Sequence, residues 1–196
     1  KKRVIRSLGN IGDSRAIPAL IGEMGKHNCP ELAAHALGRI GDPEAVDALI
    51  SALGEPDNVW DQFLKKLNVI AALGRIKDAR AVDPLISLLG NRAGSFNPAP
   101  LLSDDLRDVE PLLSQFGTVS GAAADALGKI GDSRAIEPLI QALRSGGTDL
   151  RAQAVRALSA IGDASAAEAL AWAAKEDRDP RVRNTAASAL VALRKK

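Results

Sequence analysis

The chain has 196 residues, of which 46% are hydrophobic and 26% are charged, a balance typical of a soluble protein that buries a core. Two Trp and three Phe are its only aromatic residues, so the core must consist of Ala, Leu, Ile and Val, and this composition favours helices over strands. The net charge of +2 is too balanced to indicate a nucleic-acid or anionic-membrane partner, and a single cysteine excludes a disulfide framework and a multi-cysteine zinc site.

One phrase of sequence recurs along the chain, which indicates a repeat architecture. Its first copy reads SLGNIGDSRAIPALI, and the copies, including a weaker fifth and a truncated sixth, occupy residues 7–21, 36–50, 72–86, 126–140, 157–171 and 189–193. Each copy contains one anchor leucine, and these are Leu8, Leu37, Leu73, Leu127, Leu158 and Leu190. Three of the five intervals between them are close to 30 residues, so the basic unit has about 30 residues.

Each unit is predicted to contain two helices. Helix A follows the Gly-Asp dipeptide, with apolar residues at the spacing of one helical face, and helix B runs through the next Ala-Leu-Gly. The glycine suits a left-handed helix C-terminus, and the aspartate after it can accept hydrogen bonds from free N–H groups. Because Pro84 and Pro138 must lie in a first helical turn, we expect helix A to begin near Arg80 and Arg134, after a short turn that an aspartate such as Asp78 caps.

Two units are longer than the others. A long helix is predicted from about residue 59 to 76, and its first turns carry the apolar residues Trp60 and Phe63. Residues 91–104 are predicted to form a loop, and the segment 106–113 to form an extra helix of the A type, so that an irregular insertion covers about 91–116. We expect Phe96, Leu101, Leu102 or Phe116 to pack near the Trp60 and Phe63 end, so that the insertion walls one side of a groove. The alternative is a structural plug over exposed apolar residues.

The repeated phrase, ALGxIGDxxAVxxLIxxL, resembles the HEAT-like repeats first described in phycobilin lyase subunits, and the resemblance covers most of the chain apart from about 91–104. It implies an all-α, armadillo-like fold: a right-handed α-solenoid (alpha-alpha superhelix) of about five helical hairpins with one irregular insertion, spanning 1–196 as a single domain. Stacked hairpins would share one continuous core. Because such repeats occur in proteins of many functions, the resemblance alone does not indicate an activity.

Candidate catalytic and metal-binding residues are few. Deoxyhypusine hydroxylase, a relative with this repeat, binds two irons through His-Glu pairs, but neither histidine of this chain, His27 or His35, is followed by Glu. We interpret Cys29 as a small residue at the start of a helix rather than as a nucleophile. No catalytic residue, no metal site and no cofactor are therefore predicted.

The same resemblance implies that the B helices line the concave face of the solenoid. If the positions two residues before and after each anchor leucine point inward, the groove carries the basic residues Arg6, His35, Arg39, Arg75, Lys129 and Arg156. Such a groove could recognise an anion, namely an acidic peptide, a phosphate or a carboxylate. The alternative is that these side chains are solvated and simply complement the helix dipole near helix C-termini.

We therefore expect a cytoplasmic, monomeric, non-enzymatic scaffold that binds a protein or peptide of acidic character in this groove. Apolar anchors for the partner would come from the region of the insertion, and the candidates are Trp60, Phe63, Phe96 and Leu101. No apolar run approaches the roughly 20 residues of a membrane span, and neither a membrane nor nucleic acid is expected as partner. One alternative is an enzyme or enzyme subunit of the bilin-lyase type, which would handle a tetrapyrrole. Another is a repeat segment of a larger adaptor protein, because the chain starts inside a repeat and without Met.

Overall fold

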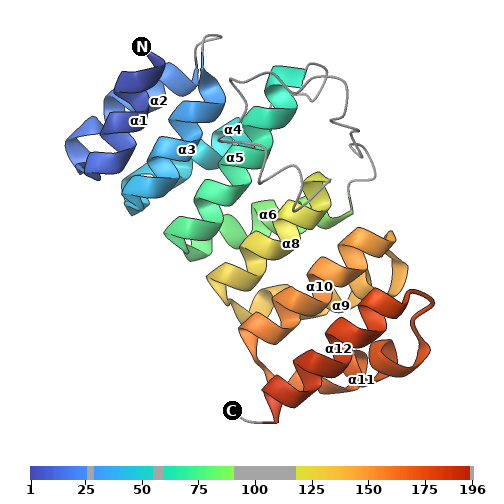
Figure 1. Ribbon diagram of the computed structural model, residues 1–196. Helices are drawn as coiled ribbons and strands as arrows, with labels where there is room; N and C mark the ends of the chain where they lie inside the picture. The colour runs from blue at the N-terminus through green and yellow to red at the C-terminus, as the bar shows by residue number, and fades with distance from the viewer. Residues whose placement is uncertain (26–28, 55–59, 91–117, 195–196) are drawn as a thin grey trace.

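The computed structural model describes residues 1–25, 29–54, 60–90 and 118–194, and all regular secondary structure in these residues is helical. The helices form two stacked layers, and the two ends of the chain lie at opposite ends of the stack (Figure 1). The predicted α-solenoid is confirmed. The predicted insertion at about 91–116 lies outside the described residues.

One layer contains the helices that carry the anchor leucines, which we call the B helices. They are α1 (Lys2–Ile11), α3 (Pro30–Ile40), α5 (Trp60–Ile76), α8 (Val119–Ile130), α10 (Thr148–Ile161) and α12 (Pro180–Leu193). The other layer contains the A helices, which are α2 (Ile17–Met24), α4 (Val46–Leu53), α6 (Val82–Leu89), α9 (Ile136–Ser145) and α11 (Ala167–Glu176). Each A helix contacts the B helix that follows it in sequence, so the repeating unit is an A–B hairpin (Figure 1).

The Gly-Asp signal has the predicted structure. Four B helices end at a glycine in the left-handed conformation, with φ between 74° and 79°, and these are Gly12, Gly41, Gly131 and Gly162. In each described repeat the following aspartate accepts a hydrogen bond from the backbone N–H two residues later, as Asp78 does from Arg80. The capped segment is a 3₁₀ turn, such as Ala79–Ala81, and the α-helix begins at Val82. Helix A therefore starts two residues after the predicted position near Arg80, because the aspartate cap stabilises a 3₁₀ turn first.

The Ala-Leu-Gly triplet organises the B layer. Its leucine is fully buried in α3, α5 and α8, and so is Leu158 of α10, where the triplet reads Ala-Leu-Ser. Its glycine faces the triplet alanine of the next B helix so closely that a Cβ on Gly38 would lie 2.6 Å from Cα of Ala72, and one on Gly128 would lie 2.7 Å from Cα of Ala157. Gly9 and Gly74 make the same approach to Ala36 and Ala126. Adjacent B helices thus approach more closely than any side chain on these glycines would allow.

The two layers are not equally tight. Every B helix contacts the next one along the stack, whereas adjacent A helices touch only slightly. Neighbouring units therefore lie closer together on the B side than on the A side, and we call the outer surface of the B layer the B-helix face.

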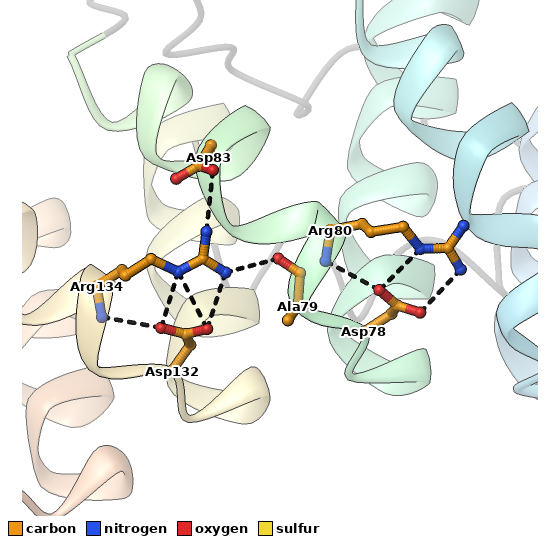
Figure 2. Close-up of polar contacts among 6 residues, drawn as sticks. All are labelled: Asp78, Ala79, Arg80, Asp83, Asp132 and Arg134. Carbon is orange, nitrogen blue, oxygen red and sulfur yellow. Dashed lines mark hydrogen bonds and ion pairs between the residues drawn. The ribbon is translucent and has the colours of Figure 1, made fainter.

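Arginine side chains connect adjacent units on the A side (Figure 2). Arg134 binds Asp132 of its own turn and reaches back to the preceding repeat, where it donates to Asp83 Oδ2 at 3.0 Å and to the carbonyl oxygen of Ala79 at 2.9 Å. Arg80 repeats this pattern toward Asp47 Oδ2, at 2.8 Å, and toward the carbonyl oxygen of Pro43. These arginines act as clamps between repeats.

A buried ion pair links the last two hairpins. Nε and Nη2 of Arg151 on α10 each donate to a carboxylate oxygen of Asp177 at 2.8 Å, and the two side chains are only 3% and 2% exposed. Asp177 follows α11 and also accepts from the backbone N–H of Asp179. The hydrogen bonds from Arg151 hold the pKa of the Asp177 carboxyl below its ordinary value.

Candidate functional site

The B-helix face presents one exposed side chain two residues after each anchor leucine. These side chains are Asn10, Arg39, Arg75, Lys129, Ala160 and Ala192, and all are exposed to solvent. The positions two residues before the leucines are exposed or half-buried, and they hold Arg6, His35, Ala71, Asp125, Arg156 and Ser188. The two predicted rows are therefore accessible, while the three residues between them are buried in the central helices α3, α5 and α8. We call Arg39, Arg75 and Lys129 the central basic row.

Arg39 and Arg75 lie on the neighbouring helices α3 and α5 (Figure 1). The contact of Gly38 with Ala72 brings these two helices together one residue before Arg39. Surrounding protein atoms desolvate the Arg75 guanidinium although its side chain is exposed, and this desolvation, followed by the positive charge of Arg39, lowers the pKa of Arg75. The positive charge of Arg39 on the adjacent helix therefore adds to the desolvation in disfavouring the charged form of Arg75.

Lys129 extends the row onto α8 but is already paired. Its Nζ lies 2.6 Å from Oδ2 of Asp125, one helical turn earlier, and its side chain is 44% exposed. Its Cδ would lie 3.6 Å from a Cβ on Gly74, so its aliphatic stem covers the glycine beside Arg75. The i, i+4 spacing of Asp125 and Lys129 was the available sequence signal for this pair.

The outer basic residues lie on other B helices. Arg6 on α1 and Arg156 on α10 are exposed, and His35 on α3 is half-buried. Arg6 and Arg156 lie on the helices that flank the central basic row, because α1 contacts α3 and α10 contacts α8.

Of the four candidate apolar anchors, only Phe63 has a side chain in the described part of the structure. Phe63 is only 6% exposed and belongs to the core, so its ring offers little surface to a partner. Trp60 begins α5, but its side chain is outside the described part of the structure, as are Phe96 and Leu101. The predicted contact of the 91–104 loop with the Trp60 end also lies outside the described residues.

The groups with catalytic potential are sparse in the described residues. Cys29 is buried at the start of α3, and desolvation raises the pKa of its thiol, which disfavours the reactive thiolate. Among residues 1–25, 29–54, 60–90 and 118–194, no cluster of three or more His, Cys, Asp or Glu side chains could hold a metal ion. No helix in the same residues has the length and apolar character needed to cross a membrane.

A shallow depression of about 470 Å³ lies at the C-terminal end of the stack, away from the central basic row. Its walls include Ala167 and Ala171 of α11, which stand where the preceding repeat has Ile136 and Ile140, together with Leu190 and Leu193. Smaller residues in the last A helix thus leave an apolar hollow without a basic row beside it. No site was predicted there, although the change from Ile to Ala is visible in the sequence.

Comparison with known proteins supports the repeat assignment. A family model of HEAT repeats matches residues 1–62, 30–96 and 109–191. An engineered protein of known structure is 19% identical with a TM-score of 0.54, and the match covers 100% of this chain and 92% of that one. The complex of CpcE and CpcF of phycocyanin lyase from Nostoc sp. PCC7120 is 26% identical with a TM-score of 0.46, covering 97% of this chain and 80% of that one. Comparison with curated proteins finds no significant match.

Proposed function

Because this chain belongs to the HEAT-repeat family, we propose that it is a non-enzymatic scaffold that binds a protein or peptide partner on its concave B-helix face. The observation that carries this proposal is the central basic row, in which three consecutive B helices present Arg39, Arg75 and Lys129 at equivalent exposed positions. The row sits on closely packed helices, so the backbone positions from which its side chains project are fixed before a partner arrives. Such preorganisation reduces the entropy lost on binding.

The partner we propose is acidic where it meets this row. A positive surface attracts negatively charged segments and accelerates their encounter, and arginine is enriched among residues that dominate binding energy. Arg6, His35 and Arg156 would extend the contact toward α1 and α10. The Trp60 and Phe96 region would add apolar contacts from the side of the insertion.

We further propose that the chain acts as a single solenoid domain over 1–196, as a monomer in the cytoplasm. The support for a reducing compartment is the single cysteine, which is free and buried. A bilin-lyase-type enzyme remains the alternative, in which the same arginines would meet the propionates of a tetrapyrrole.

Affinity capture from a lysate of the source organism tests the proposal. The bait is the wild-type chain, a variant with Arg39→Glu, Arg75→Glu and Lys129→Glu, or a control with Arg144→Glu, Lys175→Glu and Arg178→Glu. The control residues are exposed and lie outside the B helices. Each substitution replaces one positive charge with one negative charge, so both variants change the net charge from +2 to −4.

We expect mass spectrometry to identify a protein that the wild type and the control variant retain and the central-row variant loses. Purified partner should then bind the wild-type chain in calorimetry. Equal capture by all three baits would refute the assignment of the binding face. A new visible absorbance band on mixing with a bilin would support the tetrapyrrole alternative instead.

A further inference from the structure

We propose that Arg39 and Arg75 form a two-arginine site for a single phosphate monoester, which the partner presents as a phosphorylated side chain. This inference rests on the proposed scaffold function and specifies the chemistry of the partner. It restricts the anion-binding site to two residues of the central basic row and leaves out Lys129, because Asp125 neutralises that side chain.

The geometry of the site comes from the approach of α3 to α5. A Cβ on Gly38 would lie 2.6 Å from Cα and 2.7 Å from Cβ of Ala72, so these two helices are as close as backbone atoms permit. Arg39 follows Gly38, and Arg75 lies one turn beyond Ala72, at the equivalent position of the next repeat. Their side chains therefore project from adjacent helices onto the same B-helix face, where both are exposed.

The positive charges of Arg39 and Arg75 are not balanced by a carboxylate of the described residues. In the part of the chain that the structure describes, neither Arg39 nor Arg75 has a hydrogen bond or an ion pair. By contrast, the guanidinium groups of Arg80, Arg134 and Arg151 each donate hydrogen bonds to a carboxylate and to a backbone carbonyl oxygen. Two like charges held close together raise the free energy of the unliganded protein, and a bound dianion would reverse that repulsion.

The residues beside the pair favour a compact dianion over a long acidic segment. On α8 the next row position is Lys129, which Asp125 neutralises at 2.6 Å, so a carboxylate borders the pair on that side. A run of acidic residues extending along the row would meet the negative charge of Asp125. On α5 the residue one turn before Arg75 is the small, half-buried Ala71, which leaves room beside the guanidinium.

Phosphate fits two guanidinium groups better than a carboxylate does. A guanidinium presents several donors in a planar fork, and a phosphate monoester offers three acceptor oxygens and up to two negative charges. Both arginines can therefore bind one phosphate group through separate oxygens. A lone carboxylate has two oxygens and one charge, and it would satisfy one fork.

Binding to peptides tests the proposal. The probes are a degenerate peptide library with one fixed phosphoserine and the matched library with serine, each measured by fluorescence anisotropy. We expect the wild-type chain to prefer the phosphorylated library, and Arg39→Gln with Arg75→Gln to weaken that binding about 10- to 100-fold. The variant Arg39→Lys with Arg75→Lys keeps both charges but loses the forks, and we expect it to recover only part of the affinity. A control with Arg144→Gln and Arg178→Gln should bind as the wild type does.

Thermal unfolding gives a second readout that needs no peptide. In chloride, Arg39→Gln should raise the unfolding temperature or leave it unchanged, because it removes a repulsion. Inorganic phosphate at matched ionic strength should raise the unfolding temperature of the wild type more than that of Arg39→Gln with Arg75→Gln. Phosphate also stabilises proteins in general, but this effect is the same for both proteins and drops out when their two shifts are compared. A shift with phosphate and no preference for the phosphopeptides would assign the site to free phosphate and refute a phosphorylated partner.

The failure of this inference is distinguishable from the failure of the scaffold function. Equal binding of both libraries would overturn the phosphorylated partner, and equal phosphate shifts in wild type and variant would overturn the phosphate site itself. If the central-row variant still loses a captured protein in that case, the scaffold function stands with a partner of other chemistry.

Discussion

Lys77 is the one non-glycine residue with a positive φ among the described residues, at 61°. It occupies the position where four other B helices end in a left-handed glycine. A side chain in this conformation brings Cβ close to the following carbonyl oxygen, and glycine avoids that contact. The third repeat therefore keeps the geometry of the helix end at the expense of local strain.

We predict that Lys77→Gly stabilises the protein by about 0.5–1 kcal/mol, because relief of the strain exceeds the greater entropy of glycine in the unfolded chain. Chemical denaturation of wild type and variant measures the difference. Gly41→Lys is the mirror control and should destabilise by about 1 kcal/mol, since Gly41 has φ 74° and an added Cβ would meet no atom within 4 Å, which leaves backbone strain as the only cost. A loss of stability in Lys77→Gly would contradict this account.

The Arg151–Asp177 pair makes a different prediction at the residue scale. Since both side chains are buried, replacing Arg151 with Met leaves the Asp177 carboxylate without its partner. We expect a loss of about 3–5 kcal/mol in the free energy of unfolding at neutral pH. The double variant Arg151→Met with Asp177→Asn removes the orphaned charge and should lose less. An equal loss in both variants would show that the buried charge is not the cause.

The pH dependence of the same pair has a defined sign. The pKa values of Asp177 and of Asp13, the latter lowered from 3.8 to about 2 by Arg15, are depressed in the folded state. Their contribution is present above the unfolded pKa and is lost as the pH falls through the folded one. Wild-type stability should therefore decrease between about pH 4 and pH 2. In Arg151→Met burial would instead raise the Asp177 pKa, so acidification from about pH 6 to pH 4 should reduce its deficit relative to wild type.

At the scale of the helices, the glycines of the B layer determine how closely adjacent units stack. Gly38 has the backbone of Ala72 against it, so an added methyl group must separate α3 from α5. Gly22 in α2 has no atom within 4 Å of an added Cβ, and the same substitution there only improves helix propensity. Comparing Ala substitutions at Gly38 and Gly22 therefore distinguishes the effect of close helix approach from the effect of backbone entropy.

We predict that Gly38→Ala destabilises by about 1–3 kcal/mol because of overpacking against α5. Gly22→Ala should stabilise by about 0.5–1 kcal/mol. Denaturant unfolding of both variants measures whether the free energy of unfolding falls in Gly38→Ala and rises in Gly22→Ala. Equal effects of the two substitutions would show that the α3–α5 contact can relax without loss.

At the scale of the whole molecule, stability is distributed by contact between neighbouring repeats. In α3 the residues equivalent to Val4 and Ile11 of α1 are Ala33, which is fully buried, and Ile40, which packs against the core. On α1 itself Val4 is 60% exposed and Ile11 is 70% exposed, because no A helix covers that side in the described structure. The central α5 has neighbours on both sides in its own layer.

Hydrogen exchange measured by mass spectrometry should reflect this gradient. We expect the amides of α1 to exchange faster than those of α5 and α8, because terminal units open without disturbing the rest of the stack. Arg134→Gln removes the hydrogen bonds that tie the turn before α9 to α6, so it should accelerate exchange in α9. Uniform protection in all helices would indicate that the solenoid opens as one cooperative unit.

Local features of this protein follow from its sequence alone. The recurring Ala-Leu-Gly and Gly-Asp signals depend on interactions within a few residues, so they predict the helical hairpins, the left-handed glycines and the aspartate caps. The helical period also predicts which positions of the B helices face solvent, as Arg39 and Arg75 do. The exact start of helix A differs by two residues because a capped 3₁₀ turn competes with the α-helix.

Contacts between repeats were decided only by the tertiary structure. Arg134 reaches Asp83 from 51 residues away, and Arg151 meets Asp177 from 26 residues away. No local pattern predicts these pairs, since they depend on how neighbouring hairpins stack. The same reason applies to Arg39 and Arg75, whose proximity depends on the Gly38–Ala72 approach. The pair of Lys129 with Asp125, by contrast, lies within one helix at i, i+4 spacing and is a local feature. Helix periodicity determines which residues are exposed, whereas helix packing determines which exposed charges meet.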